Sequence, residues 1–184
     1  ILLPTLLAGF LDPVIGSGIW RNLLEGVLRL LIFFGFLFSV SRMKDIRRTF
    51  SYHGAEHKSI HCYENGLPLT VENVQKFPKE HPRCGTSFLF VVMIISILVF
   101  SLVSWSNPFV RMVMRLVLLP VVVAISYEIN RAVGRCDNAL TRFLRLPGLF
   151  MQKMTTFEPE DDMVEVAIEA LKRVIPENKG ADTW

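Results

Sequence analysis

The chain has 184 residues, of which 51% are hydrophobic and 20% charged, with a net charge of +3 and a mean hydropathy of +0.40. This composition excludes a disordered chain and a collagen-like repeat, and it argues against a water-soluble domain. The 20 basic residues are nearly balanced by 17 acidic ones, so they do not form the basic surface of a nucleic-acid-binding protein. We therefore expect an integral membrane protein without a nucleic-acid partner.

Three stretches are apolar and long enough to cross a membrane as helices. A hydrocarbon core about 30 Å thick requires roughly 20 residues of helix, and residues 22–40, 86–105 and 109–127 meet this requirement. Residues 1–11 are apolar but too short to cross alone, so we interpret them as the end of a longer helix, with a re-entrant or interfacial segment as the alternative. The predicted fold is an all-α polytopic membrane protein with three complete transmembrane helices and a partial N-terminal one.

A few polar residues interrupt these stretches. Glu25 and Arg29 are four residues apart on one helical face, and we expect them to neutralise each other. Arg111 and Arg115 are expected to extend toward the lipid headgroups. Pro120 is expected to kink the last helix.

The basic residues predict the orientation. Sixteen of the 20 Lys and Arg residues lie between Arg42 and Arg83 or after Glu128, and cytoplasmic segments carry the excess of positive charge. The chain then divides into N-terminal transmembrane helices (1–41), a cytoplasmic histidine-rich region (42–84), a transmembrane hairpin (85–128) and a cytoplasmic C-terminal region (129–184). All three cysteines, Cys62, Cys84 and Cys136, are expected to be reduced thiols on the cytoplasmic side.

All four histidines fall in the region 42–84: His53, His57, His61 and His81. If a helix runs to a stop at Asn65-Gly66, the first three recur every four residues on one face, and Glu64 extends the row. Two imidazoles one turn apart can bind one metal ion, but the first and third would be about 12 Å apart along the axis. A closed site therefore requires a ligand from elsewhere, and the best candidates are His81 and Cys84.

The segment from His53 to His57 also reads His-x-x-Glu-His, the inverted zinc-peptidase pattern, in which two histidines are ligands and Glu56 is the general base. Such a site needs a downstream ligand, and Glu128 is the candidate at the cytoplasmic end of the last span. Imidazole and thiolate ligands favour Zn²⁺ over other divalent metals. The alternative is that the histidines bind headgroups or backbone, and Cys62 is expected to be a packing residue.

The C-terminal region contains two further predicted elements. Residues 131–154 mix arginines with large apolar residues, which predicts a segment along the inner leaflet, broken at Pro147-Gly148. Residues 158–162 predict an acidic helix start with Pro159 in its first turn, and residues 163–174 continue as an amphipathic helix. This helix is expected to pack on the histidine-rich region, or to bind a protein partner or a second copy of the chain.

Several segments resemble one family. Residues 50–58, 81–88, 146–148 and 152–156 closely resemble the YqhQ-like bacterial membrane proteins, a family of unknown function described as predicted metal-dependent enzymes. The resemblance implies a bacterial cytoplasmic membrane protein. It supports a set of seven site residues, with His61 at a position where the family varies: His53, Glu56, His57, Glu64, His81, Cys84 and Glu128. A glycine-rich stretch that precedes the family's first span has no counterpart here.

Two functions follow as expectations. The first is a metal-dependent hydrolase that acts at the cytoplasmic face of the membrane on a peptide or a lipid-linked substrate, with membrane lipid as its surroundings. The alternative is a membrane scaffold or partner-docking protein with a structural metal whose coordination is closed by protein. Metal transport is less favoured, because the spans contain no row of carboxylates or histidines.

Overall fold

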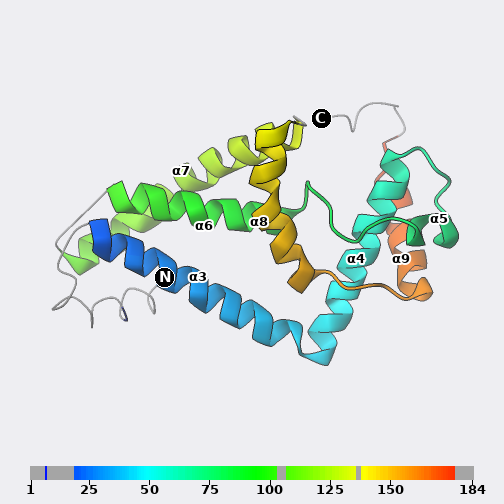
Figure 1. Ribbon diagram of the computed structural model, residues 1–184, viewed down its shortest axis with the longest axis horizontal. Helices are drawn as coiled ribbons and strands as arrows, with labels where there is room; N and C mark the ends of the chain where they lie inside the picture. Colours follow the sequence, from blue (N-terminus) through cyan, green and yellow to red (C-terminus); the bar gives the residue numbers. More distant parts are fainter. Residues whose placement is uncertain (1–6, 8–18, 103–106, 136–137, 177–184) are drawn as a thin grey trace. The chain divides into compact units, whose positions relative to one another are not determined.

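The computed structural model describes residues 7, 19–102, 107–135 and 138–176 (Figure 1). All regular structure in these ranges is helical, in agreement with the all-α prediction. Apart from Leu7, the predicted N-terminal segment 1–11 lies outside the described residues. The elements are α3 (Ile19–Ser41), α4 (Lys44–Glu64), α5 (Val71–Gln75), α6 (Gly85–Leu102), α7 (Pro108–Arg135), α8 (Ala139–Thr155) and α9 (Asp161–Lys172).

Three of these helices are long and apolar enough to cross a membrane: Trp20–Ser41 in α3, Gly85–Leu102 in α6, and Met112–Arg135 in α7. These match the three predicted spans, although α7 continues eight residues past the predicted end at Tyr127. The hydropathy falls after Tyr127, but the backbone remains helical, and Glu128 pairs with Arg131 one turn later. Before α7, the side-chain oxygen Oδ1 of Asn107 accepts a hydrogen bond from the Phe109 N–H at 2.9 Å, which caps the start of the helix.

The chain forms two compact units. The first, which we call the span unit, comprises residues 1–37 and 88–133. The second, the histidine unit, comprises residues 38–87 and 134–184.

Within the span unit, the predicted Glu25–Arg29 ion pair forms, but Glu25 pairs more closely with Arg115. The Arg115 guanidinium makes a two-pronged hydrogen bond to the Glu25 carboxylate, whereas Arg29 lies 3.6 Å from the same carboxylate and donates to Ser96. The prediction that Arg115 extends to the headgroups is therefore wrong. Glu25 and Arg115 are almost completely buried, and a buried carboxylate requires a partner that can satisfy both of its oxygens. The side chain of Arg111 lies outside the described residues.

The core of the histidine unit lies where α4, α5 and α9 meet, and its buried members are Ala55, Cys62, Val74, Met163, Val164 and Ile168. Cys62 is fully buried there, which confirms it as a packing residue. The amphipathic C-terminal helix packs on α4 as predicted. It begins at Asp161 with Glu160 as its N-cap, so Pro159 precedes the helix instead of lying in its first turn.

Helix α8 belongs to the same unit and is continuous from Ala139 to Thr155, so the predicted break at Pro147-Gly148 is wrong. A capping box between Asn138 and Thr141 fixes its start. Gly148 allows close approach to Ser87, because a Cβ atom at Gly148 would lie only 2.6 Å from the Ser87 hydroxyl. This packing supports the helix across the proline, whose missing N–H costs one hydrogen bond. That α8 lies along the inner leaflet stays a prediction.

Candidate metal centre

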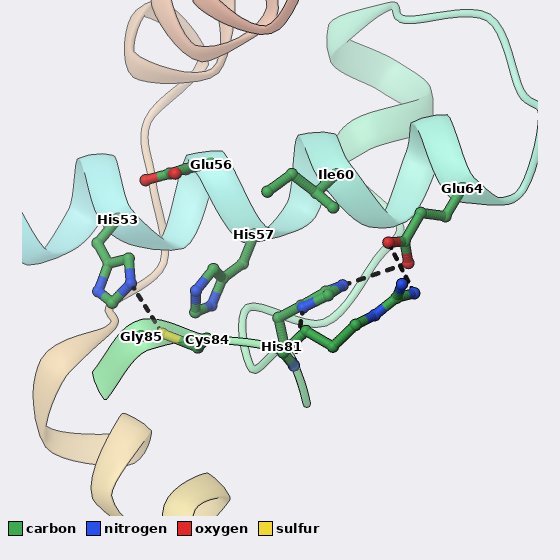
Figure 2. Close-up of a pocket in the computed structure, with 9 residues that line it drawn as sticks. His53, Glu56, His57, Ile60, Glu64, His81, Cys84 and Gly85 are labelled. Atoms are coloured by element: carbon green, nitrogen blue, oxygen red, sulfur yellow. Dashed lines mark hydrogen bonds and ion pairs between the residues drawn. The ribbon is translucent and has the colours of Figure 1, made fainter. Parts of the chain in front are cut away.

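The long helix α4 presents the histidine row. His53, His57 and His61 lie on one face, and the helix ends at Asn65 with Gly66 in a left-handed conformation (φ 68°), as the sequence predicts. The rings of His53 and His57 are 4.3 Å apart between centroids, and His81 lies 4.5 Å from His61. Figure 2 shows how the loop that carries His81 and Cys84 folds back under this face.

The first potential ligand group consists of His53, His57 and Cys84. One ligand atom from each lies within 4.8 Å of the other two, so the group could hold a metal ion. The Cys84 sulfur is 3.3 Å from His53 Nε2. Cys84 immediately precedes α6 and is buried, as is His57. The potential third ligand of this group therefore comes from outside the helix, at the start of a candidate span.

Two backbone carbonyls orient the two rings. His53 Nδ1 lies 2.9 Å from the Thr155 carbonyl oxygen, and His57 Nδ1 lies 2.6 Å from the Lys79 carbonyl oxygen. A carbonyl only accepts, so Nδ1 carries the proton in both rings. Nε2 is therefore the nitrogen of each ring that faces a metal ion. Histidines that bind metal ions usually donate the N–H of their other ring nitrogen to a carbonyl, a carboxylate or a water molecule in this way. In the metal-free protein, His53 Nε2 shares a proton with the Cys84 sulfur 3.3 Å away, and a bound metal ion would displace that proton.

The segment that supplies the Thr155 carbonyl is held closely against α4. A Cβ atom at Gly54 would collide with the Phe157 carbonyl oxygen, so only glycine permits this approach. The Phe157 N–H donates to the Phe50 carbonyl at 3.0 Å. Nearby, the buried ammonium of Lys58 pairs with Glu158 at 2.8 Å. These contacts fix the position of the atom that orients His53.

The electrostatics favour a thiolate at Cys84. Burial alone would raise the pKa of this thiol, but hydrogen bonds with His53, His57 and Thr86 outweigh burial and lower the pKa to about 5. The same hydrogen bond with Cys84 raises the pKa of His53 against the opposing effect of burial. Cys84 is therefore ionised at neutral pH, and the thiolate is the form of cysteine that binds metals.

The second potential ligand group consists of His61, Glu64 and His81, whose ligand atoms also lie within 4.8 Å of one another. His81 Nδ1 accepts a hydrogen bond from the Arg83 N–H at 3.2 Å, so the ring proton is on Nε2, which lies 3.3 Å from Glu64. Glu64 also pairs with the Arg83 guanidinium at 2.8 Å. Burial and the nearby His61 lower the pKa of His81 to about 4. His81 is thus neutral and already uses both nitrogens.

Gln152 holds the loop between these groups and is fully buried. Its amide accepts from the His81 N–H at 2.7 Å and donates to the His81 carbonyl and to the Ser87 hydroxyl, both at 2.8 Å. One side chain of α8 therefore holds the His81 backbone and the Ser87 side chain, which lie on either side of Cys84 in the sequence. This clamp constrains where the cysteine sulfur lies relative to α4.

An open cavity of about 240 Å³ adjoins the first group and extends to Glu64 and Arg83. Glu56 is exposed and also lines this cavity. It precedes His57 by one residue, about 100° around the helix. Figure 2 accordingly shows its carboxylate leaving α4 in a different direction from the two rings.

The remaining predicted residues are placed as follows. Glu128 belongs to the span unit, where it is exposed and pairs with Arg131, and it is in neither ligand group. Cys136 lies outside the described residues. The orienting carbonyls of Thr155 and Lys79 have no signature in the sequence, because every residue has a carbonyl. A glycine in the middle of the histidine helix, Gly54, was the one available sign of a close backbone approach.

Comparisons with known proteins identify relatives but no activity. The family model described as "Protein of unknown function (DUF1385)" matches residues 1–177. The chain is 38% identical over 175 residues to "Uncharacterized protein YqhQ" of Bacillus subtilis (strain 168), an alignment that covers 95% of this chain and 55% of that protein. The chain thus spans about half the length of this relative. No solved structure matches the present chain. On these grounds the chain belongs to the DUF1385 family of proteins of unknown function.

Proposed function

We propose that this protein is a metal-dependent hydrolase of the bacterial cytoplasmic membrane, with Zn²⁺ held by His53, His57 and Cys84 and with Glu56 as the general base. The substrate is a peptide or a lipid-linked compound at the cytoplasmic face. The observation that carries the proposal is the pairing of three oriented ligand atoms with an open cavity. Catalytic zinc sites have three protein ligands and an open position, whereas structural sites have four protein ligands.

The donor set fits zinc. With zinc bound in place of the proton between His53 and Cys84, both imidazoles would offer Nε2 lone pairs, since their Nδ1 atoms donate to the Thr155 and Lys79 carbonyls. The low pKa of Cys84, about 5, supplies a thiolate. Imidazole and thiolate together are typical ligands of zinc. Bound there, zinc would polarise the scissile group and lower the pKa of water.

Glu56 has the position and freedom that a general base needs. It lines the same cavity as the ligands and is exposed, so its side chain can turn toward a substrate at the rim. In hydrolysis, Glu56 takes a proton from the attacking water and passes it to the leaving group, while the bond to that group breaks. His53 and His57 stay fixed by their carbonyl partners during this step.

The chain supports a location at the membrane surface. Cys84 is followed directly by Gly85, the first residue of a candidate span. On the other side, α4 begins at Lys44, three residues after the candidate span in α3 ends at Ser41. The excess of Lys and Arg in residues 42–83 and after 128 supports the cytoplasmic orientation.

The test is Glu56→Gln in the full chain, purified with zinc and assayed on fluorogenic lipid esters, phosphoesters and peptides. We expect the variant to keep its zinc and to lose roughly 10²–10⁴-fold in turnover, because the general base is gone. Glu72→Gln, an exposed acid on α5 with only a Lys76 partner, is the matched control. A fully active Glu56→Gln protein would remove Glu56 from the mechanism. Zinc content that survives a His53→Ala, His57→Ala double substitution would contradict the proposed site.

A further inference from the structure

A second hollow adjoins the candidate metal centre. It is a groove of about 420 Å³ between α4 and the C-terminal part of α9. Its walls are mostly apolar and include Tyr52, Ile60, Val166, Ala170, Leu171 and Val174. We call it the α4–α9 groove.

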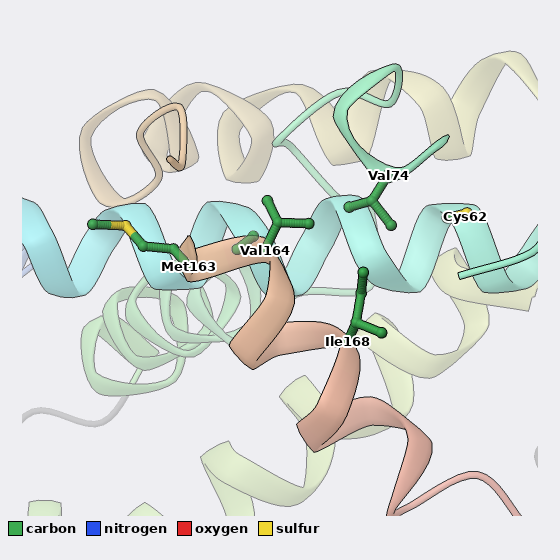
Figure 3. Packing of buried hydrophobic residues seen from close by; sticks show 6 residues of the cluster. Cys62, Val74, Met163, Val164 and Ile168 are labelled. Atoms are coloured by element: carbon green, nitrogen blue, oxygen red, sulfur yellow. The ribbon is translucent and has the colours of Figure 1, made fainter. Parts of the chain in front are cut away.

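Helix α9 forms this groove because it has two apolar faces. Met163, Val164 and Ile168 are buried in the core against α4, as Figure 3 shows. A second row, Val166, Ala170 and Val174, recurs every four residues and remains exposed, with Val174 at 73%. The core does not require this second row, and exposed apolar surface of this kind marks a binding site.

The groove adjoins the metal-site cavity, and the two hollows share part of their walls. Glu56 and Ile60 line both hollows, so the proposed general base lies at their junction. A compound that occupies the groove therefore presents one end to Glu56. This also accounts for the direction of the Glu56 side chain, which leaves α4 away from the histidine rings (Figure 2).

An unpartnered hydroxyl lies along the groove. Ser59 lines it and is 1% exposed, and its Oγ has no hydrogen-bond partner among the described residues. A buried hydroxyl without a partner is costly, whereas an ester or phosphate oxygen of a ligand would give it one. The groove thus combines apolar walls with a single polar atom, as lipid-binding sites require.

Other features of the histidine unit indicate contact with lipid. Helix α8 contains three basic residues and no acidic residue. Leu140, Phe143 and Phe150 are 61–68% exposed, whereas Gln152 on the same helix is fully buried. This composition favours binding at the surface of an anionic bilayer. With α8 at the membrane, as predicted, lipid is the apolar compound in greatest supply next to this unit.

We propose that the α4–α9 groove binds the hydrocarbon chain of the substrate, so that the substrate is a membrane lipid or a lipid-linked compound whose scissile bond is placed at Glu56. This inference rests on the proposed hydrolase function and specifies its substrate class. The hydrocarbon chain lies along Val166, Ala170 and Val174, and its polar end enters the cavity.

The experiment uses the full chain in nanodiscs of phosphatidylglycerol, a fraction of which carries a photoactivatable diazirine in one acyl chain. After irradiation, mass spectrometry locates the labelled residues. We expect label on residues 52–60 and 166–174 in addition to the spans. Ala170→Trp, which fills the groove, should reduce groove labelling several-fold while labelling of the spans stays constant.

Glu169→Trp is the matched control, since it introduces the same side chain at an exposed neighbouring position. Val174→Asp is a second variant that places a charge in the groove without added bulk, and it should also reduce the label. Absence of groove labelling in the unsubstituted protein would overturn the proposal. So would labelling that both groove variants leave unchanged, or displacement of the label by an apolar peptide at lower concentration than by lipid.

Failure of this inference can be told apart from failure of the hydrolase proposal. Cys84→Ser removes a zinc ligand, so it should abolish zinc binding and hydrolysis yet leave groove labelling unchanged. Label without zinc-dependent hydrolysis in the unsubstituted protein would keep the lipid site and refute the enzyme. Zinc-dependent hydrolysis of peptides, with no photolabel in the groove, would keep the enzyme and refute the lipid site.

Discussion

The His53–His57–Cys84 group and the His61–Glu64–His81 group lie one after the other along α4 and contain similar residues, yet their ring nitrogens are used differently. In the first group, carbonyls accept the Nδ1 protons and leave both Nε2 atoms as lone-pair donors. In the second, the Arg83 N–H occupies His81 Nδ1, and the other nitrogen bonds to Glu64. Residue type and spacing do not distinguish two such groups. The backbone partners of the rings are what distinguish the two potential ligand groups, and they favour the first as the proposed metal site.

The largest expected effect is loss of zinc from the first group. Cys84→Ser should reduce bound zinc from about one ion per chain to near zero, because two imidazoles without the thiolate make an incomplete site. Elemental analysis of the purified full chain measures this. Cys62→Ser is the control, since Cys62 is also buried but lies in the hydrophobic core of the histidine unit, outside both ligand groups. Equal zinc in Cys84→Ser and unsubstituted protein would show that Cys84 is no ligand.

The second prediction concerns the pH dependence of alkylation at the two buried cysteines, Cys84 and Cys62. In zinc-free protein, Cys84 should react with iodoacetamide at a rate that is half-maximal near its pKa of about 5, whereas burial raises the pKa of Cys62 and delays its reaction to alkaline pH. Mass spectrometry of the peptides separates the sites. Similar pH profiles of the alkylation rate for both cysteines would contradict a thiolate at Cys84.

The lowered pKa of Cys84 also affects the free energy of unfolding. Its stabilising contribution is complete above the ordinary pKa of 9.0, decreases as the pH falls, and is absent below about pH 5.

A smaller effect should come from displacing the carbonyl that orients His53. In Gly54→Ala, the new methyl group meets the Phe157 carbonyl, so the segment with Thr155 must move. Loss of such an outer hydrogen bond typically weakens metal binding roughly 10–100-fold, and competition with a fluorescent chelator measures it. Gly35→Ala in α3 is the matched control, because a Cβ there meets nothing within 4 Å. Unchanged zinc affinity in Gly54→Ala would show that His53 does not depend on this carbonyl.

The helices were largely predictable, because hydropathy and a four-residue period depend only on residues close in sequence. The partners of buried charges were predicted only in part. Glu25 and Arg29 have ideal spacing on one helix, but the structure pairs Glu25 more closely with Arg115 on another helix. Spacing in the sequence predicts only the neighbours on the same helix. A buried carboxylate pairs with whichever basic group in the fold can reach both of its oxygens, and that group can lie on another helix. The break predicted at Pro147-Gly148 failed similarly, since contact with Ser87 lies outside the local sequence.

The candidate site, like the fold, was predictable from the sequence only in part. Clustering of histidines and the geometric limit on a straight row predicted an added ligand from the loop at 81–84, and each potential ligand group does contain a side chain from this loop. The separation into two groups depends on the Lys79 and Thr155 carbonyls and on the Gln152 clamp. These contacts join segments from 22 to 102 residues apart. No pattern within a single helix contains that information.

The smallest expected effect tests the second group directly. Glu64→Gln removes the charge that pairs with Arg83, but the amide oxygen still accepts from one of the two neighbours. Because Glu64 and Arg83 are each about one-third exposed, the pair contributes no more than about 1 kcal/mol, and zinc affinity should change by less than about fivefold. If Glu64→Gln instead releases zinc as completely as Cys84→Ser, the ion requires the Glu64 carboxylate. The His81 nitrogens would then have to exchange their present partners for the metal, and the contrast between the two groups would be reversed.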